Sequence, residues 1–320
     1  MWKFIVRRIL IMIPQLILLS LIVFILAKFM PGDALTGEID PSVDPAEMER
    51  KREELGWNDP WYEQYGRWIS GVVQGDFGKS FRHKMAVTDL IGQRLVNTFW
   101  LSLAALIFTY IIAIPLGIIS GRYNDRWIDQ AITGYTYIGF ATPIFIFALL
   151  MVWFFGFYLD LFPTGGSVKP GLTPGTIEYI LSKLYYILLP ALSMALITTV
   201  GTVQYLRNEI VDTKHKDFII TARAKGASER RIYNHHIFRN ALLPIAAFFG
   251  YELGGLIGGS IFIESIFSYP GMGNLFLESI MLRDYAVVTA AVLIFGAATI
   301  LGSLISDIIL SIVDPRIRIK

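Results

Sequence analysis

The chain has 320 residues, of which 54% are hydrophobic and 17% charged, and its formal net charge is +2. Soluble proteins carry about 25% charged residues, so this composition excludes an ordinary soluble domain and predicts a membrane protein. The absence of cysteine from the sequence excludes disulfides and thiolate metal sites.

Six long apolar runs follow one another along the sequence. A bilayer core of about 30 Å needs roughly 20 apolar residues in a helix, and backbone groups in lipid must hydrogen-bond within their own segment. Each run is therefore predicted to be a transmembrane helix, in which a proline marks a kink or a helix start. The runs are Ile9–Ala27, Phe99–Ile119, Ala131–Leu159, Leu184–Leu206, about Ala241–Ile263, and Tyr285–Ser306, with prolines at Pro14, Pro115, Pro143, Pro190 and Pro244.

The distribution of basic residues sets the predicted orientation. With the N-terminus inside, the short inner segments hold 16 Lys and Arg; the outer connections hold 12, nine of them in the long loop from Lys28 to Asn97. Because short cytoplasmic loops are rich in basic residues and long loops escape this rule, both chain ends are predicted to be cytoplasmic. Lys3, Arg7 and Arg8 also suit a signal peptide, but the first run exceeds the roughly 7 to 15 apolar residues of a signal-peptide core.

Residues 1–97 are predicted to form the first helix and a large extracytoplasmic loop. The loop is mixed and acidic, with a helix expected near Pro45–Leu55, and its aromatic residues suit either a membrane interface or a small packed cap. A second outer stretch, Asp160–Lys183, is rich in Gly, Pro and Thr and is expected to be a loop with room for a short helix. The aromatic residues are Trp57, Trp61, Tyr62, Tyr65 and Trp68.

Three acidic residues lie within or at the ends of the predicted spans. Glu252 is clearly inside, Glu264 lies near the outer end of the fifth helix, and Asp307 lies near the inner end of the last. A carboxylate in lipid is costly and is by default a functional candidate. An ion-coupled transporter would show several such groups with partners. The three are predicted to be structural or part of a pathway, and for Glu252 a structural or cavity-lining role is favoured over ion coupling.

The fifth run also contains Gly250, Gly254 and Gly258, spaced four residues apart. Glycines at this spacing share one helix face and let a neighbouring backbone approach closely. Tight packing within the bundle is the favoured interpretation, and a gate-lining or subunit-contact helix is compatible with it.

The segment Arg207–Arg239 holds eight basic and four acidic residues, so it cannot lie in lipid. A short helix is predicted over Asp217–Lys225; Gly226 supplies a stop, because glycine adopts the left-handed conformation at a helix end. Ser228 is a plausible N-cap for a second helix that runs toward the membrane. On the first helix, Phe218, Ile219 and Ala222 are expected to share a face.

Several kinds of chemistry have no motif in the sequence. The G-x-x-x-x-G-K-[ST] phosphate loop is absent, and Val73 stands where the nearest approach needs its first glycine. The four histidines lack metal-ligand spacing, and no serine lies in G-x-S-x-G. No catalytic residue, metal site or bound cofactor is therefore predicted on this chain.

The string TARAKGASERRIYNHHIFRNALLP resembles the cytoplasmic signature loop of binding-protein-dependent ABC transporter permeases, in the variant of the dipeptide, oligopeptide and nickel subfamily. The generic signature reads E-A-A, three residues, G, then I-x-L-P. Here Ile220 and Thr221 replace the Glu and Ala, and Pro244 lies 18 residues after Gly226. Both departures fit this subfamily, whose members typically read TARAKG followed by HxxRNALLP.

The resemblance extends over nearly the whole chain, in order. It begins with KFIVRRIL, continues through QYGRW in the outer loop, and reaches the last residues. The other segments that carry it are MPGD (Met30–Asp33), GDFGKS (Gly75–Ser80), Asn97–Thr98, ESIFSYPGMG (Glu264–Gly273), and Asp307 with DPRIR (Asp314–Arg318).

This resemblance implies an all-α, multi-pass protein of a bacterial or archaeal inner or plasma membrane, with the type I ABC importer permease fold. The five-helix core would span residues 98–313, with a cytoplasmic coupling loop at 207–240 and a cytoplasmic tail at 314–320. It also implies a heterodimer with a second permease, two cytoplasmic ATPase subunits that hold ATP and Mg, and an extracytoplasmic peptide-binding protein. Membrane lipid is expected around the chain, and no nucleic acid. The implied coupling helix comprises Asp217, Phe218, Thr221, Ala222, Arg223, Ala224, Lys225 and Gly226.

Oligopeptides or dipeptides are the favoured substrate, since the spans contain no His or Cys to relay a metal. A nickel importer of the same family remains an alternative. An ion-coupled secondary transporter and an intramembrane enzyme are alternatives from other classes.

Overall fold

The computed structural model describes residues 2–29, 50, 53, 58–80 and 82–313. The predicted helix near Pro45–Leu55 falls mostly outside these residues, and the MPGD and DPRIR motifs fall wholly outside them. Among the described residues, the regular secondary structure is helical, apart from one isolated bridge between Lys79 and Ala86, and turns and loops connect the helices. In chain order the helices are α1 (Trp2–Phe29), α3 (Trp61–Val73), α4 (Val87–Arg122), α5 (Trp127–Ala141), α6 (Ile144–Met151), η1 (Val152–Tyr158), α7 (Ile177–Lys214), α8 (Asp217–Ala224), α9 (Glu229–Arg231), η2 (Ile232–Ile237), α10 (Phe238–Ala241), α11 (Leu243–Gly255), α12 (Ile261–Ile266), α13 (Met272–Met281) and α14 (Tyr285–Val313).

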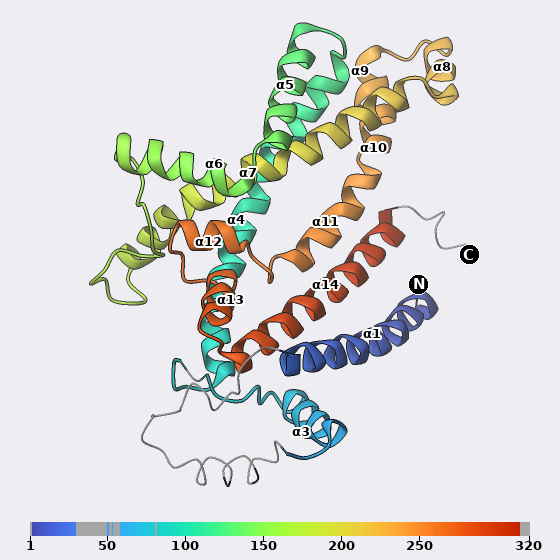
Figure 1. Ribbon diagram of the computed structural model, residues 1–320. Coiled ribbons are helices and arrows are strands. Elements are labelled where there is room, and N and C mark those ends of the chain that lie inside the picture. The colour runs from blue at the N-terminus through green and yellow to red at the C-terminus, as the bar shows by residue number, and fades with distance from the viewer. Residues whose placement is uncertain (1, 30–49, 51–52, 54–57, 81, 314–320) are drawn as a thin grey trace.

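Two long helices, α4 and α7, pack against each other and form the central pair (Figure 1). Small residues on α4 allow the close approach: a Cβ at Gly117 would lie 2.9 Å from Leu206, and one at Gly121 would lie 2.8 Å from Ile210. Both helices begin earlier than predicted, α4 at Val87 instead of Phe99 and α7 at Ile177 instead of Leu184, because helix continues beyond the apolar run.

The third apolar run forms two helices instead of one. Its two parts, Trp127–Ala141 and Ile144–Tyr158, are bent by 105° at a short break. Pro143 occupies the N-cap position of α6, so it acts as a helix start, and the residue before it, Thr142, is extended, as the steric demand of proline favours. The run Ala131–Leu159 is thus not one continuous helix, and Pro143 is a helix start, one of the two roles predicted for it.

The fifth apolar run is broken as well. The helix α11 begins with Pro244 in its first turn and ends at Gly255. A turn follows, in which Gly259 has a φ of +59°, and Ser260 then caps α12 by accepting a hydrogen bond from the Ile263 N–H at 3.4 Å. The predicted continuous helix over Ala241–Ile263 is wrong because these turn residues interrupt it.

The last helix, α14, packs between α11 and α1. A Cβ at Gly254 would collide with the Cα of Gly302, and a Cβ at Gly250 would collide with the Cα of Ser306. These two glycines therefore serve the close backbone packing that their spacing predicted. Gly258 lies beyond the end of α11, and a Cβ there would make only an ordinary contact of 3.6 Å with the Gly255 carbonyl oxygen.

The helix α3 packs on the end of α1 that precedes the outer loop. Tyr65 and Ser20 share a hydrogen bond of 2.8 Å between their hydroxyls, and the rings of Tyr65 and Trp68 lie 5.4 and 5.8 Å from that of Phe24. Part of the loop is thus a packed cap. Of the other predicted aromatics, Trp61 and Tyr62 are exposed and Trp57 lies outside the described residues.

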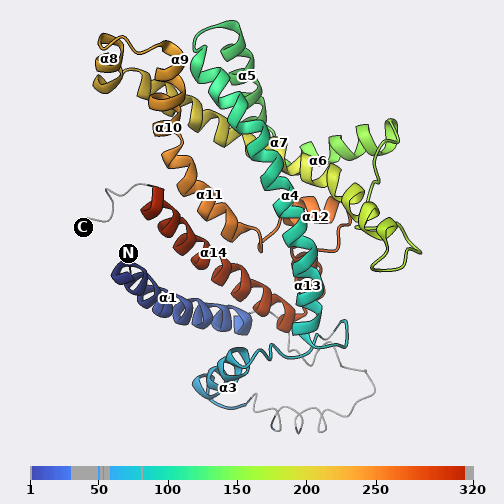
Figure 2. The same cartoon turned by 180° about the vertical axis from the view of Figure 1, so that it is seen from behind.

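Among the described residues, four helices are long and apolar enough to cross a membrane, namely α1, α4, α7 and α14. The bent pair α5 with α6 and η1 makes five if it counts as one span. The predicted count of six spans is not confirmed. Figures 1 and 2 show α8 and the α4–α5 connection at one end of the molecule and α3 at the other, with the described ends of α1 and α14 side by side.

Candidate functional site

The predicted coupling segment forms a short helix, a sharp stop and a second helical stretch. Helix α8 ends in a Schellman motif, in which the Ala227 N–H donates to the Ala222 carbonyl at 3.1 Å and the Gly226 N–H to the Arg223 carbonyl at 2.9 Å. Gly226 has a φ of +78°, a conformation that other residues adopt at a cost. The stop predicted at Gly226 is thus present.

The second helical stretch runs from Glu229 to Ala241 as α9, η2 and α10. Ser228 occupies the N-cap position, but its side chain makes no capping hydrogen bond. The six residues Ile232–Ile237 form a π-helical turn, which the sequence did not indicate. The predicted helix is therefore present, whereas the side-chain cap at Ser228 is not.

One face of α8 anchors it to the transmembrane helices. Ile219 is fully buried in an apolar cluster with Leu206 and Ile210 of α7 and with Ile232 and Ile237 of η2, and Ala222 packs against the same cluster. Burial of one such side chain is worth about 1.5–3 kcal/mol relative to exposure. Residues from both ends of the segment, in α8 and η2, thus share one apolar cluster with α7.

The opposite face of α8 is exposed. Phe218 and Ile220 are 41% and 58% exposed. Phe218 lies one turn before Ala222, at the edge of the anchored face, and it is more exposed than the predicted face shared with Ile219 and Ala222 implied. The remaining exposed residues of the predicted coupling helix are Asp217, Thr221, Arg223, Ala224, Lys225 and Gly226.

An ion pair bridges the break at Gly226. Arg223 Nε donates to Glu229 Oε1 at 2.8 Å, and Nη2 donates to Oε2 at 3.3 Å. The guanidinium lowers the pKa of Glu229. Both side chains are exposed, so solvent screens the pair and its contribution to stability is small.

Two basic residues connect the coupling segment to the α4–α5 connection. The Arg122 guanidinium lies 5.1 Å from the ring centre of Tyr233 in η2. Lys214, at the end of α7, donates to the Arg122 carbonyl at 3.0 Å and lies 5.8 Å from the same ring. These contacts place the end of α4 directly against the coupling segment.

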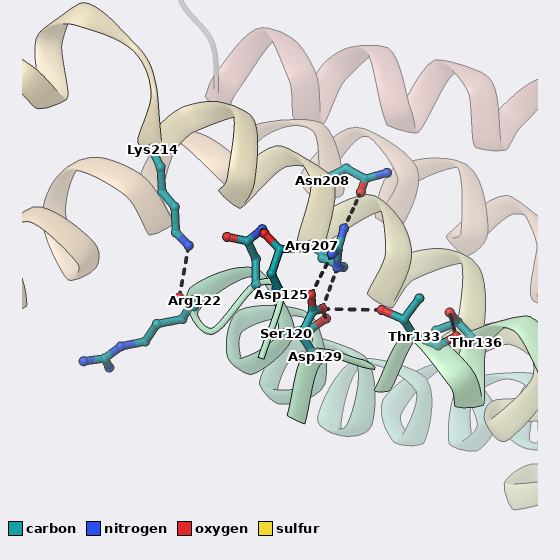
Figure 3. Close-up of polar contacts among 10 residues, drawn as sticks. Ser120, Arg122, Asp125, Asp129, Thr133, Thr136, Arg207, Asn208 and Lys214 are labelled. Carbon is teal, nitrogen blue, oxygen red and sulfur yellow. Dashed lines mark hydrogen bonds and ion pairs between the residues drawn. The ribbon is translucent and has the colours of Figure 1, made fainter. Parts of the chain in front are cut away.

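A buried ion pair lies behind this contact, between α5 and α7 (Figure 3). Arg207 donates from Nε and Nη2 to the two carboxylate oxygens of Asp129, each at 2.7 Å. Asp129 is 2% exposed and also accepts from the Ser120 hydroxyl and, at 2.8 Å, from the Asp125 N–H. One carboxylate thereby holds α4, α5 and α7 together.

Glu252 lies on α11 and faces a pocket between α4, α7 and α11. Its Oε2 accepts a hydrogen bond of 2.6 Å from the Tyr110 hydroxyl. The pocket has a volume of about 220 Å³ and is also lined by Ser102, Thr109 and Thr198. Glu252 is therefore a cavity-lining residue with one protein partner.

Glu264 is fully buried and joins two segments that are distant in the sequence. Its carboxylate accepts from the Thr98 hydroxyl at 2.8 Å and from the Asn274 N–H at 3.0 Å. Gly259 and Gly271 lie so close that a Cβ at either position would collide with this carboxylate. Glu264 thus has a structural position, and the Asn97–Thr98 and ESIFSYPGMG motifs meet around it.

Asp307 forms an ion pair of 3.0 Å with Arg8, which connects α14 to α1. Asp307 does not line the pocket of Glu252. The three acidic residues singled out in the sequence are therefore not brought together. Among the described residues, no cluster of three His, Cys, Asp or Glu side chains is arranged to hold a metal ion.

The Asp129–Arg207 pair and the Tyr110 partner of Glu252 were not predicted from the sequence. Asp129 and Arg207 lie just outside the third and fourth apolar runs, at ends predicted to be on the same side. Opposite charges at two span ends on the same side of the membrane could have indicated this pairing. The sequence around Tyr110 gives no signal of its hydrogen bond to Glu252, because aromatic residues are common inside apolar runs.

Comparison with known proteins places this geometry in a family. A model of the binding-protein-dependent transport system inner membrane component matches residues 113–319, and a model of the N-terminal part of such membrane components matches residues 1–104. The solved structure of the MetNI methionine ABC transporter matches with a TM-score of 0.52 at 15% identity, covering 70% of this chain and 96% of that chain. This likeness concerns the fold alone.

Curated relatives agree over the full length. The chain is 40% identical to the oligopeptide transport system permease protein AppB of Bacillus subtilis, over 99% of this chain and 100% of that protein. It is 34% identical to a putative peptide permease protein of Brucella suis and 32% identical to the glutathione transport system permease protein GsiC of Escherichia coli K12, with both chains fully covered in each case. The chain belongs to the family of binding-protein-dependent transport system inner membrane components.

Proposed function

We propose that this chain is one of two different permease subunits that together form the pathway of an ATP-driven importer for oligopeptides or dipeptides. In this proposal the chain has no enzymatic activity. Two ATPase subunits hold ATP and Mg on the cytoplasmic side, and an extracytoplasmic binding protein delivers the peptide.

The observation that carries this proposal is the two-faced helix α8. One face is fixed by Ile219 to the transmembrane helices, and the other presents the apolar side chains of Phe218 and Ile220 at the end of the molecule (Figure 1). Exposed apolar residues at a rigid protrusion suit insertion into a groove of a partner. In our proposal, ATP-driven closure of the ATPases moves α8, and the shared cluster carries the movement into α7.

The movement requires differential binding. An ATPase can shift the permease between inward-open and outward-open states only if its contacts with α8 differ in free energy between the two. The Arg223–Glu229 pair and the Schellman stop help α8 keep its shape, so force on the helix is passed on instead of being absorbed by unwinding.

The proposed topology has six spans with both chain ends in the cytoplasm. The four long helices supply four of these spans. The bent pair α5 with α6 and η1 supplies one more, and the broken segment α11 with α12 supplies the other. This assignment is supported by the basic residues Arg122, Arg126 and Lys214, which gather at the same end as α8, since cytoplasmic loops are rich in Lys and Arg. The chain is accordingly assigned to the inner or plasma membrane.

Peptides are favoured as the substrate because the relatives with full-length similarity are named as oligopeptide, peptide and glutathione permeases. The nickel and ion-coupled alternatives gain no comparable support. The binding protein can determine much of the substrate selectivity, so the choice of substrate does not depend on this chain alone.

The test is uptake by the reconstituted complex of both permeases, the ATPases and the binding protein in proteoliposomes. Labelled peptides of graded length should accumulate only with ATP, and nickel should not. A complex with hydrolysis-deficient ATPases is the control. Nickel accumulation without peptide uptake would exclude the peptide proposal, and accumulation without ATPase subunits would exclude the ABC importer mechanism.

A further inference from the structure

The pocket of Glu252 is an incompletely paired polar site at the middle of the bundle. Its walls come from the central parts of α4 and α7, at Ser102 to Thr109 and Met194 to Thr198, and from the last turns of α11. Similar lengths of α4 and α7 extend on both sides of it. The pocket therefore lies near half depth in the bundle, where a transported solute must pass.

The acceptors in this pocket outnumber the donors that the protein supplies. Within the described chain, Glu252 accepts one hydrogen bond, at Oε2 from Tyr110. Thr109 and Thr198 share a hydrogen bond of 2.8 Å with each other. Ser102 is 4% exposed, and its hydroxyl has no hydrogen-bond partner in the described structure. A buried hydroxyl without a partner and a carboxylate with one are both costly.

A primary ammonium group supplies what the site lacks. It carries one positive charge and three N–H donors, which match the free carboxylate oxygen of Glu252 and the oxygen of the exposed Thr198 hydroxyl. The Ser102 hydroxyl oxygen is covered by protein and is out of reach. The other walls are apolar, with Ala105, Leu106, Met194 and Leu256 among them. Such walls suit the carbon atoms next to an amine better than they suit a hydrated metal ion.

The size of the pocket limits what enters it. Its volume of about 220 Å³ is below the roughly 300–1,000 Å³ of pockets that enclose a drug-sized ligand. The end of a peptide fits this space, whereas a whole oligopeptide does not.

We propose that Glu252 and Thr198 form a transient site for a primary ammonium group of the peptide, either its N-terminus or a lysine side chain, as the peptide crosses the membrane. This inference rests on the proposed function. The site has a single charged residue, so it binds weakly and releases the peptide, as a pathway requires.

The absence of cysteine from the chain makes a direct test possible. Gly255 lines the pocket, is exposed, and has open space where a side chain would extend. In a complex whose partner subunits lack accessible thiols, Gly255→Cys introduces a unique thiol, and its rate of alkylation by N-ethylmaleimide reports occupancy of the pocket. The nucleotide-free complex in nanodiscs, without the binding protein, is treated with millimolar trialanine or N-acetyl-trialanine.

We expect trialanine to slow alkylation at about tenfold lower concentration than N-acetyl-trialanine, because a charge-assisted hydrogen bond is lost on acetylation. Glu252→Gln in the same background should abolish this difference. The matched control Glu178→Gln, which removes an exposed carboxylate at the start of α7, should preserve it. Protection by N-acetyl-alanyl-lysyl-alanine would identify the lysine ammonium as a second source.

Equal protection by trialanine and its acetylated form would overturn the proposal, as would an unchanged difference in Glu252→Gln. If Glu252→Gln does not assemble, the comparison of the two peptides on Gly255→Cys alone still decides between these outcomes. The uptake experiment tests the proposed function separately: ATP-driven peptide uptake without discrimination at the thiol refutes only the ammonium site.

Discussion

Arg207 of α7 and Asp129 of α5 are joined by two parallel hydrogen bonds of 2.7 Å, and the carboxylate is almost completely buried. Removal of one partner from a buried pair leaves an uncompensated charge, at a cost of about 3–5 kcal/mol. Arg207→Met should therefore lower the thermal unfolding midpoint of the purified complex markedly. The double variant Asp129→Asn with Arg207→Met should recover part of the loss, because no charge remains buried.

The matched control for this pair is Arg126→Met, which removes an exposed arginine from the neighbouring α4–α5 connection. Its unfolding midpoint should stay close to that of the unmodified protein. A single variant Arg207→Met that is as stable as the Arg126 control would contradict a stabilising role for the pair.

Gly226 should tolerate substitution poorly because its backbone has a positive φ, and not because neighbouring atoms leave no room for a side chain. Its φ is +78°, and nothing lies within 4 Å of the position that a Cβ would occupy, so Gly226→Ala should cost about 1–2 kcal/mol locally through strain alone. We expect reduced uptake with normal membrane levels for Gly226→Ala, and loss of uptake for Gly226→Asp. Gly201→Ala, at a helical glycine with equally open space, should be neutral, and normal uptake in Gly226→Asp would refute the coupling role of this turn.

The exposed face of α8 should contact an ATPase subunit. Ile220→Cys gives the chain its only thiol, and it should cross-link to single thiols placed along one surface groove of the ATPase. Phe218→Asp should abolish ATP-driven uptake while the permease remains in the membrane, because a charge replaces an apolar contact. A thiol at Gly66 of α3, at the opposite end of the molecule, is the negative control, and cross-linking there with equal yield would argue against a specific interface.

Glu264 should be essential for stability and not for substrate recognition. Glu264→Ala leaves the buried Thr98 hydroxyl and the Asn274 N–H without their acceptor, and each unpaired group costs about 1–3 kcal/mol. The variant should have a lower unfolding midpoint and lower membrane levels. Among the molecules that reach the membrane intact, the relative uptake of different peptides should not change.

The Arg223–Glu229 pair should give the coupling segment a weak dependence on pH. The pKa of Glu229 is lowered in the folded state from its ordinary 4.5. Its contribution is therefore complete above the ordinary value and is lost as the pH falls through the lowered folded value. Arg223→Gln should speed hydrogen exchange of the Gly226 and Ala227 amides at pH 7, with a difference below about 1 kcal/mol. This effect should fade as the pH falls through the lowered folded pKa of Glu229.

The sequence predicted the long helices well and their limits poorly. Unbroken apolar runs located α1, α4, α7 and α14, because lipid demands such runs. The first turns of α4 and α7 were missed, since helix outside lipid has no apolar signature. The break after Gly255 was also missed. Apolar residues fill both α11 and α12, and composition alone does not distinguish one continuous helix from two helices joined by a turn.

Within the candidate site, local chemistry was predictable and tertiary pairing was not. The stop at Gly226 follows from the properties of glycine. The outward position of Phe218 depends on which face of α8 meets the cluster around Ile219, and this is decided by contacts with α7 and η2. The pairing of Asp129 with Arg207 likewise depends on how two distant helices align.

The backbone contact between Gly254 and Gly302 has a mechanical consequence. A Cβ at Gly254 would lie only 2.3 Å from the Cα of Gly302, so the two main chains are in direct contact with no side chain between them. Arg8 and Asp307 connect α1 to α14. We therefore expect Glu252, on α11, to move together with α14 and α1, so that a change in access to its pocket is a rotation of these three helices against the α4–α7 pair.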